Sequence, residues 1–406
     1  MATIVGTERD DDIVGTAKAD VIVGRGGRDI INGGRGNDII CGGLGPTRTE
    51  NGDAVIQLLY GGPGEDVIVG GPGDEVVGGG DGVDWLLGRG GDDYVYGGEE
   101  GEGPGQADVL RGGAGTDWLD GHGGDDMLLG QAGGDYFEDG GGDNSLLGGS
   151  GNDRLLSGPG NDVIVGGPGV DTVDYITVLP RGSSLVDHCS TVTADLSAGV
   201  GSGAGFGVDA LKGVNNVVTG GGQDVLTGDA RANTFYVGKP CLGAPIHREI
   251  VAGGGGSDRI SFDSGPWEYE AAFGPVTVDL VAGTAGQRSD FDATVVEIAL
   301  NSIENVTGTE FPDVIRGDDS PNRLTTGGGT QSGVGDAIYG GGGDDRLSGS
   351  DGRDTINGDE GADTLRGRAG NDRLDGGLDV NTIDGGRGKD SCQNPDRHNG
   401  ALNCEM

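Results

Sequence analysis

The chain of 406 residues has few aromatic side chains and few basic ones. Phe, Trp and Tyr make up 4% of it, and 26 Lys and Arg stand against 67 Asp and Glu, for a net charge of −41. Because nucleic-acid binding requires clustered Lys and Arg, this balance excludes nucleic acid as an obvious partner and favours a cation. No apolar run approaches the roughly 18–20 residues of a membrane span, so we expect no transmembrane segment.

A secretory signal is also missing from the start, MATIVGTERD, which has no basic segment followed by an apolar one. We expect that a signal was removed or that export uses another route. None of the five cysteines lies in a CxxC pair, so a zinc site is not expected. Cys392 and Cys404 close a short C-terminal segment. A disulfide there would fit an oxidising compartment, and the alternative is two free thiols. Cys189 and Cys241 are a second candidate pair, which leaves Cys41 over.

Self-similarity dominates what is present. From Gly6 the chain reads GTERDDDIV, GTAKADVIV, GRGGRDIIN and GGRGNDIIC, a period of nine with the pattern G-G-x-G-x-D-x-U-x, where U is a large apolar residue. The frame is interrupted by expansions at 42–60 and 97–111, runs without a slip to Asp174, and returns at 340–393. A flexible linker would need no fixed phase, so we interpret the pattern as a structural repeat.

The block between these runs contains a longer duplication. VTADLSAG at 192–199 matches VTVDLVAG at 276–283, and residues 211–235 match residues 300–324. The sequence therefore predicts four segments: an N-terminal repeat array at 1–174, a duplicated irregular block at 175–335, a C-terminal array at 336–393, and a cap at 394–406.

Each nonapeptide can build one turn and one short strand. Glycines at positions one, two and four permit positive φ in the turn. Positions seven to nine form the strand, so position eight faces inward while seven and nine face outward. Parallel stacking of such strands satisfies their backbone groups and gives a thin core. The predicted core residues are Ile13, Ile22, Ile31, Ile40, Ile68, Val77, Leu86, Val95, Leu119, Leu128, Phe137, Leu146, Leu155, Ile164 and Val173.

The turns combine main-chain carbonyls with the carboxylate at position six. Calcium takes 6–8 such oxygens in flexible geometry, whereas magnesium demands a tighter octahedron with more water. Transition metals prefer His or Cys, and only four histidines are present. We therefore expect multiple calcium ions as the cofactor.

With this spacing, the chain resembles the RTX family of hemolysin-type calcium-binding repeats. The resemblance implies an all-β fold, a parallel β-roll or β-solenoid with two nonapeptides per turn. It also implies calcium held between neighbouring turns by position-six aspartates and turn carbonyls, such as those of Gly34, Gly36, Gly149, Gly151, Gly167, Gly169, Gly341 and Gly343. The implied carboxylate ligands are Asp11, Asp20, Asp29, Asp38, Asp66, Asp84, Asp93, Asp117, Asp126, Asp135, Asp153, Asp162, Asp171, Asp258, Asp345, Asp354, Asp363, Asp372 and Asp390.

Some units depart from the pattern. Glu75, Asn144 and Asn381 replace the aspartate, so we expect weak or empty sites there, and incomplete sites beside the two expansions. The earliest units lack the glycine of the consensus and carry Glu8 or Ala17. Aspartate also favours turns without any metal, but eighteen in-phase positions argue against that alternative. An unfilled stack of carboxylates repels itself, so we expect the strict repeats to fold on binding calcium.

The outward positions of alternate units differ. One side of the N-terminal array is nearly all apolar and includes Val67, Trp85, Met127 and Val163, whereas the other side is mixed. Soluble monomers rarely expose so long an apolar strip. We therefore expect this face to be covered by the middle block, a second copy or another protein. The alternative is that short strands simply favour β-branched residues.

For function, the repeats leave no separate stretch long enough for a catalytic domain, and there is no HExxH or plausible GxSxG motif. We expect a secreted or cell-surface calcium-binding protein without catalysis. The alternatives are the repeat portion of a larger secreted enzyme or toxin, and an adhesin or surface-layer component. No outward Thr or Asn ladder supports an ice-binding solenoid.

Overall fold

The computed structural model describes residues 2–44, 56–98, 106–176, 190–238, 246–263, 274–288, 295–328, 335–393 and 403–404. Within these residues the chain is built from short strands and turns, and no helix of the length and apolarity needed to cross a membrane is present. The chain forms two compact units, residues 1–186 with 198–216 and residues 187–197 with 217–406. The four segment boundaries predicted from the repeat remain predictions.

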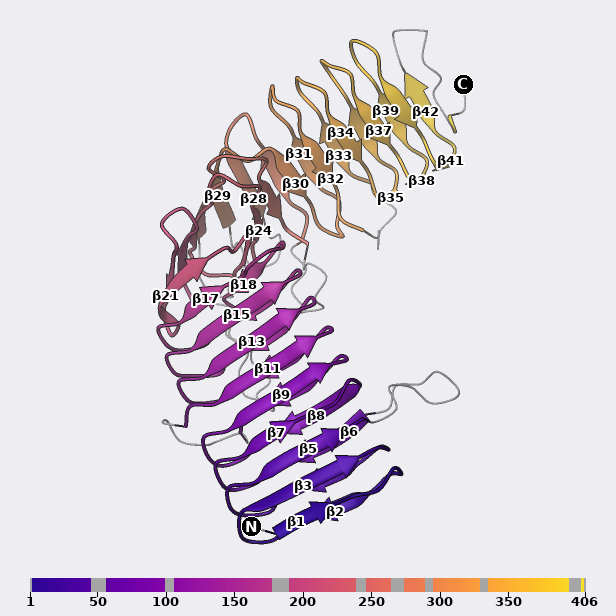
Figure 1. Cartoon of the computed structure of the whole chain (residues 1–406). Helices are drawn as coiled ribbons and strands as arrows, with labels where there is room; N and C mark the ends of the chain where they lie inside the picture. Colours follow the sequence, from indigo (N-terminus) through magenta and orange to yellow (C-terminus); the bar gives the residue numbers. More distant parts are fainter. Residues whose placement is uncertain are drawn as a thin grey trace. The chain divides into compact units, whose positions relative to one another are not determined.

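In the first unit, successive nonapeptides alternate between two parallel sheets (Figure 1). We call each nonapeptide with its strand a rung. Sheet A contains β1 (Ala2–Val5), β3 (Asp20–Arg25), β5 (Ile39–Gly43), β7 (Val67–Val69), β9 (Trp85–Gly90), β11 (Val109–Ala114), β13 (Met127–Ala132), β15 (Ser145–Ser150), β17 (Val163–Val165) and β21 (Gly207–Lys212). Sheet B contains β2 (Asp12–Val14), β4 (Ile30–Asn32), β6 (Ile56–Tyr60), β8 (Asp74–Gly78), β10 (Tyr94–Tyr96), β12 (Trp118–Asp120), β14 (Tyr136–Glu138), β16 (Arg154–Leu156) and β18 (Thr172–Asp174).

The register confirms the two-rung turn. Ile22 lies opposite Ile40 in sheet A, and Ile13 lies opposite Ile31 in sheet B, each eighteen residues apart. The two expansions each contribute one ordinary strand, β6 and β11, so they do not disturb the alternation. A hairpin of β20 (Val200–Gly203) and β21 follows β17 on sheet A.

The second unit repeats the plan around the duplicated block. One sheet contains β19 (Val192–Asp195), β23 (Val225–Thr227), β25 (Ile246–Ala252), β27 (Thr277–Asp279), β28 (Thr284–Arg288), β29 (Val295–Asn301), β31 (Val314–Arg316), β33 (Ala337–Tyr339), β36 (Thr355–Asn357), β39 (Arg373–Asp375) and β42 (Ser391–Gln393). The facing sheet contains β24 (Thr234–Tyr236), β26 (Arg259–Ser261), β30 (Asn305–Thr307), β32 (Arg323–Thr325), β34 (Arg346–Ser348), β37 (Thr364–Arg366) and β40 (Thr382–Asp384).

Three shorter pieces complete this unit. The turns β35 (Asp351–Gly352), β38 (Ala369–Gly370) and β41 (Arg387–Gly388) pair in parallel with one another. Strand β28 runs antiparallel to both β27 and β29, which is the insertion that the longer duplication announced. Strand β22 (Asn216–Val218) contains the junction between the two units.

Position eight forms the core of both units. Every core residue predicted from the N-terminal array is buried, and the middle block supplies further core residues in the same phase, Leu226, Phe235, Ile260, Val306, Ile315 and Leu324. At the C-terminal end the position-eight residue of β42 is Cys392, which forms the predicted disulfide with Cys404. Cys41 is free, and Cys189 and Cys241 lie outside the described residues.

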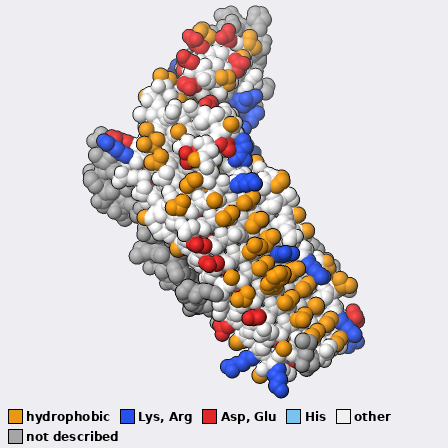
Figure 2. Space-filling view, turned by 60° about the vertical axis from the view of Figure 1, so that its left-hand side comes forward, with side chains coloured by type: hydrophobic (Ala, Val, Ile, Leu, Met, Phe, Trp, Pro, Cys, Tyr) orange, Lys and Arg blue, Asp and Glu red, His pale blue; other side chains and the backbone are white. Residues whose placement is uncertain are grey.

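The outward residues of sheet A stand in solvent. Val67, Trp85, Met127 and Val163, which we call the apolar face, are 38%, 51%, 43% and 46% exposed, so no described part of the chain covers them. Figure 2 shows rows of hydrophobic side chains over this part of the molecule. Sheet B is different at β16, where the outward residue Arg154 is buried in an ion pair with Asp174.

Candidate metal centre

The glycine at position one makes room for the carboxylate at position six. A Cβ added to Gly148 would lie 2.3 Å from Oδ2 of Asp153 and 2.6 Å from the carbonyl oxygen of Gly166 on the next rung of the same sheet. Equivalent contacts recur at Gly130 with Asp135 and at Gly358 with Asp363. Any side chain at position one would therefore displace the carboxylate, which explains why glycine recurs there.

One oxygen of each position-six carboxylate has a structural role. The amide of Asp117 donates to Oδ1 of Asp135 at 2.9 Å, and the amide of Asp135 donates to Oδ1 of Asp153 at 2.9 Å. The same bond joins Asp345 to Asp363 at 2.9 Å in the second unit. We call this chain of bonds the position-six ladder. It satisfies a buried backbone amide on most rungs, so part of the need for an oxygen-bearing side chain here is structural.

The second oxygen has no such partner on most rungs. Among the aspartates predicted as ligands, thirteen have a buried Oδ2 that accepts no hydrogen bond, and we call their rungs open. They are Asp29, Asp38, Asp66, Asp93, Asp117, Asp126, Asp135, Asp153, Asp258, Asp345, Asp363, Asp372 and Asp390. A buried ionised oxygen without a donor is strongly unfavourable, so each open rung lacks a positive or hydrogen-bonding group.

Two rungs with asparagine show what surrounds this oxygen. In Asn381 the amide nitrogen Nδ2 donates to the carbonyl oxygens of Gly376 at 2.7 Å and Leu378 at 2.8 Å. In Asn144 it lies 3.2 Å from the carbonyl oxygen of Gly142. A Cβ on Gly376, the position-one glycine of this rung, would contact Nδ2 of Asn381. On the aspartate rungs a Cβ on the position-one glycine would contact Oδ2, so the two atoms occupy the same place.

On an aspartate rung, an anionic oxygen therefore points toward the turn carbonyl oxygens. On an asparagine rung, N–H groups take that place and donate hydrogen bonds to the carbonyls. A cation relieves this repulsion, and one carboxylate oxygen with several carbonyls is the donor set that calcium prefers. Within the described residues, no group of three or more His, Cys, Asp or Glu side chains could hold a metal ion. The residues therefore fit calcium through main-chain oxygens.

Burial makes these carboxylates hard to ionise in the absence of a cation. It raises the pKa of Asp117, Asp126 and Asp345 to about 7. The pKa of Asp93 rises to about 8, mainly through burial and further through the neighbouring Glu75. Protons and a metal ion therefore compete for the same oxygens near neutral pH.

Five rungs satisfy the second oxygen internally, and we call them closed. In these the amide of position two turns inward and donates to it, as from Thr16 to Oδ2 of Asp20 at 2.7 Å and from Ser350 to Oδ2 of Asp354 at 2.9 Å. The other closed rungs pair Thr7 with Asp11, Gly71 with Glu75 and Thr309 with Asp313. The carboxylates of Asp313 and Asp354 accept a second amide bond, from Val276 and Asp336, so both of their oxygens have backbone donors.

The backbone at position two separates the two classes. On every open rung this residue has a positive φ, whereas none of the five closed rungs does. Asp224 belongs to neither class, because its buried Oδ2 accepts no hydrogen bond although Gly220 at position two has no positive φ. The positive φ is adopted even by residues other than glycine, namely Arg25, Arg89, His122, Gln131, Asp359 and Arg368. Such residues rarely adopt this conformation, which is retained where surrounding structure imposes it and which often marks functional sites.

The predicted ligands divide along this line. Of the nineteen predicted aspartates, Asp11, Asp20 and Asp354 lie on closed rungs, thirteen lie on open rungs, and Asp84, Asp162 and Asp171 have other interactions. All of the glycines named as carbonyl donors lie in turns of the two arrays. Gly34, Gly149, Gly167 and Gly341 are the position-two residues, and all four have a positive φ.

Several ladder residues escaped the sequence analysis. Asp108, after the second expansion, accepts from Asp84 at 2.7 Å. Gln57 occupies position six beside the first expansion but is not part of the ladder, since its Oε1 accepts no hydrogen bond. Asp224 and Asp313 in the middle block and Asp336 at the start of the C-terminal array take position six. The signal was available, since TGGGQDVLT at 219–227 and GTEFPDVIR at 308–316 both keep the nine-residue frame.

One acidic group does not follow the repeat. Asp139 stands at position one in place of glycine and is buried beside Asp162 and Asp209, and Ser157 donates to both Asp162 and Asp209. Burial, and then the neighbouring carboxylates, raise the pKa of Asp139 well above its ordinary value. At neutral pH this cluster therefore favours a shared proton.

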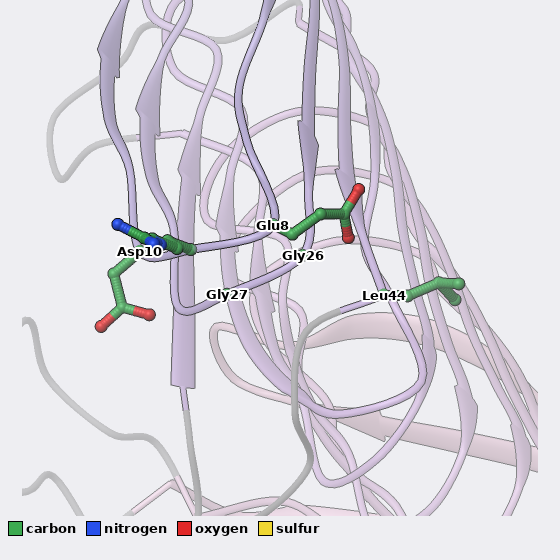
Figure 3. A pocket seen from close by; sticks show the side chains of 6 residues that line it. Glu8, Asp10, Gly26, Gly27 and Leu44 are labelled. Carbon is green, nitrogen blue, oxygen red and sulfur yellow. The ribbon is translucent and has the colours of Figure 1, made fainter.

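An open hollow of about 710 Å³ lies at the N-terminal turns, lined by Glu8, Arg9, Asp10, Gly26, Gly27 and Leu44. In Figure 3 the carboxylates of Glu8 and Asp10 point in different directions, so they do not converge on one point.

Comparison with known families agrees with this geometry. The family described as "RTX calcium-binding nonapeptide repeat (4 copies)" matches residues 5–45, 52–86, 69–100, 105–137, 138–173, 210–239, 303–330, 333–365 and 357–392. These segments cover most of both arrays and part of the middle block. No curated protein matches the chain.

Proposed function

Since the chain belongs to the RTX family of calcium-binding nonapeptide repeats, we propose that it is a calcium-binding protein whose open rungs take up Ca²⁺ as they fold. The observation that carries this proposal is the buried Oδ2 without a donor on thirteen rungs. Bound calcium supplies the positive charge that the carboxylate and the turn carbonyls share. Binding then becomes folding free energy, because the unfolded chain has no preformed site.

The residues that would hold the ion on an open rung are the position-six aspartate and the turn carbonyls around it. Asn381 identifies carbonyls of positions one and three as the neighbours of this atom. Magnesium fits less well, because its octahedron is tight and it retains water.

Closed rungs are proposed to fold without metal. Their second oxygen already accepts an amide hydrogen bond, and Asp354 accepts two, from Asp336 at 2.8 Å and from Ser350 at 2.9 Å. Asparagine rungs belong with them, since their amide nitrogen replaces the ion. This extends the sequence-based expectation of weak sites from Asn144 and Asn381 to Asp11, Asp20 and Asp354.

The test is a calcium titration of the full chain, starting in chelator and followed by circular dichroism and by equilibrium dialysis. We expect strand signal to rise with calcium, with a stoichiometry near that of the open rungs, and magnesium at equal concentration to produce little of it. Identical strand signal in chelator and in calcium, with no bound calcium, would falsify the proposal.

We propose that the protein works outside the cell. The Cys392–Cys404 disulfide favours an oxidising compartment. Extracellular modules bind calcium at about 10⁻⁴–10⁻³ M, a range in which an array of similar sites would be filled only outside the cytosol.

We propose further that the role is interaction rather than catalysis. The position-six carboxylates are buried and engaged in the ladder, so they are poorly placed for acid–base chemistry on a substrate. The exposed apolar face instead supports contact with a second copy or another protein, as in an adhesin. Light scattering of the calcium-bound chain, with Trp85→Arg as the comparison, tests self-association through this face. If the wild type and Trp85→Arg both have the mass of one chain, the apolar face does not mediate self-association, and its partner is a different protein.

A further inference from the structure

A surface groove of about 340 Å³ crosses sheet B of the first unit, away from the turn carbonyls. Its outer side chains come from positions five and seven of consecutive rungs, which are two residues apart and therefore lie on the same side of the chain, and the position-six residues Glu75, Asp93 and Asp117 also line it. Position five contributes Asp74, Asp92 and Thr116, and position seven contributes Tyr94, Trp118 and Tyr136. The groove thus combines an acidic side with an aromatic side.

The aromatic side is a continuous row of rings. The centroids of Tyr94 and Trp118 are 5.5 Å apart with planes at 65°, and those of Trp118 and Tyr136 are 5.0 Å apart at 76°. Trp118 is exposed. In this edge-to-face arrangement the rings share no common plane, but each ring keeps a negatively polarised face.

The acidic side is held in place by the backbone. The amide of Asp92 donates to Oδ1 of Asp74 at 2.9 Å, and the amide of Thr116 donates to Oδ1 of Asp92 at 2.7 Å. No ion pair of the described residues involves either carboxylate. Two fixed negative charges therefore face the groove without a basic partner.

The next rung shows which chemistry this row accepts. Arg154, at position seven of β16, places its guanidinium 5.4 Å from the centroid of Tyr136 and pairs with Asp174. A cation between a ring face and a carboxylate is thus already part of the ladder. The groove repeats those two elements, a ring and a carboxylate, without the cation.

We propose that this groove binds an organic cation, an ammonium or guanidinium group on an apolar stem. Aromatic faces and carboxylates both attract such a group, and the net charge of −41 raises its local concentration. Calcium does not fit, because it needs 6–8 oxygen ligands and one side of the groove is aromatic. A sugar ring would need a flat stacking platform, which planes at 65° and 76° do not provide.

The test uses the full chain, saturated with calcium and labelled with fluorotryptophan, and follows the fluorine NMR signals of its tryptophans. The probes are N-acetylarginine amide, which represents a side chain of a partner polypeptide, and 1,4-diaminobutane, which represents a free amine. We expect a saturable shift of the Trp118 signal with at least one probe and no shift of Trp85, which lies on sheet A. The tighter probe identifies the source of the cation.

Matched variants separate the groove from general charge attraction. Asp74→Asn with Asp92→Asn should raise the Kd about fivefold, the upper end of the range for losing one exposed ion pair. Asp125→Asn with Asp143→Asn should change it less than about twofold. Those residues have the same position-five bonds, from Asp143 to Asp125 and from Asn161 to Asp143, each at 2.9 Å.

Trp118→Leu, followed by the circular-dichroism signal to confirm folding and by calorimetry, should abolish binding, while Trp118→Phe retains it. Equal weakening by both pairs of Asp→Asn variants, or equal shifts of Trp118 and Trp85, would show that the probes act only as counterions. Either result overturns the proposal and leaves the calcium sites unaffected.

Discussion

Replacing Asp135 by asparagine should have opposite effects on stability at low and at high calcium. Burial raises the pKa of Asp135 to about 6 from 3.8, and each pKa unit is worth about 1.4 kcal/mol. Keeping this carboxylate ionised in the folded, metal-free chain at neutral pH therefore costs at most about 3 kcal/mol, and less to the extent that solvent screens the charge. Asparagine removes that cost, keeps the ladder acceptor, and adds N–H donors to the turn carbonyls, as Asn381 does.

With calcium present, the wild-type chain recovers this free energy by binding. One site contributes about 2.7 kcal/mol at a free calcium concentration of 100 Kd and about 4.1 kcal/mol at 1,000 Kd. The variant lacks this contribution, so the two stability curves should cross on the order of 100 Kd. Below the crossing the variant is more stable, and above it the wild type is.

The assay is urea unfolding at a series of buffered calcium concentrations, with an osmolyte added so that the metal-free chain remains folded. The matched control is Asp354→Asn on a closed rung, where both oxygens accept amide bonds. Burial raises the pKa of Asp354 to about 6 as well, so asparagine removes a similar ionisation cost there. It replaces only one of the two acceptors, which costs about 1–3 kcal/mol, so the difference from the wild type should be small and should not change with calcium. Asp135→Asn curves that run parallel to the wild type at all concentrations would refute the argument.

Four further outcomes follow from the same structure. In chelator, circular dichroism should show more strand at pH 5 than at pH 8. Carboxylates with a folded-state pKa raised to about 7 stabilise the fold when protonated, and this contribution is lost as pH rises through that value. In calcium the strand signal should instead be larger at pH 8, because protons compete with the ion for the carboxylates. Thr16→Gly should leave Oδ2 of Asp20 bonded to the position-two amide and add no calcium in equilibrium dialysis, because glycine at position two does not by itself give a positive φ, as Gly71 shows. Leu128→Ala, at a fully buried core position, should lower the free energy of unfolding by about 2–5 kcal/mol in calcium, measured by urea titration. Cys404→Ser should remove about 3 kcal/mol from the C-terminal rungs, seen as faster hydrogen exchange of β42 and β39 with little change in the first unit.

The fold could be predicted because the repeat fixes three things at once. Its period sets the strand spacing, its apolar position sets the inward face, and its glycines set the turn. Leu128 and Phe137 are buried on adjacent rungs as their phase requires. The disulfide of Cys392 could also be predicted from its short spacing to Cys404.

The division into open and closed rungs could not be predicted from the consensus alone. Position two holds glycine in some open rungs but arginine, histidine or glutamine in others, and all of these adopt a positive φ. A closed rung has glycine there too, at Gly71. The residue type does not determine this φ, because the hydrogen bonds of neighbouring rungs also act on it, and they are visible only in three dimensions.

Each bond of the position-six ladder joins two neighbouring rungs of one sheet, whatever the number of residues between them in the sequence. Successive acceptors are usually 18 residues apart, yet the bond from Asp38 to Asp66 spans 28 residues and the bond from Asp84 to Asp108 spans 24, at ordinary lengths of 2.6 and 2.7 Å. Length in sequence and length in space are therefore independent at the turns. Segments can therefore be inserted at these turns without a change in the packing of the core, and the strands and ion sites stay the same.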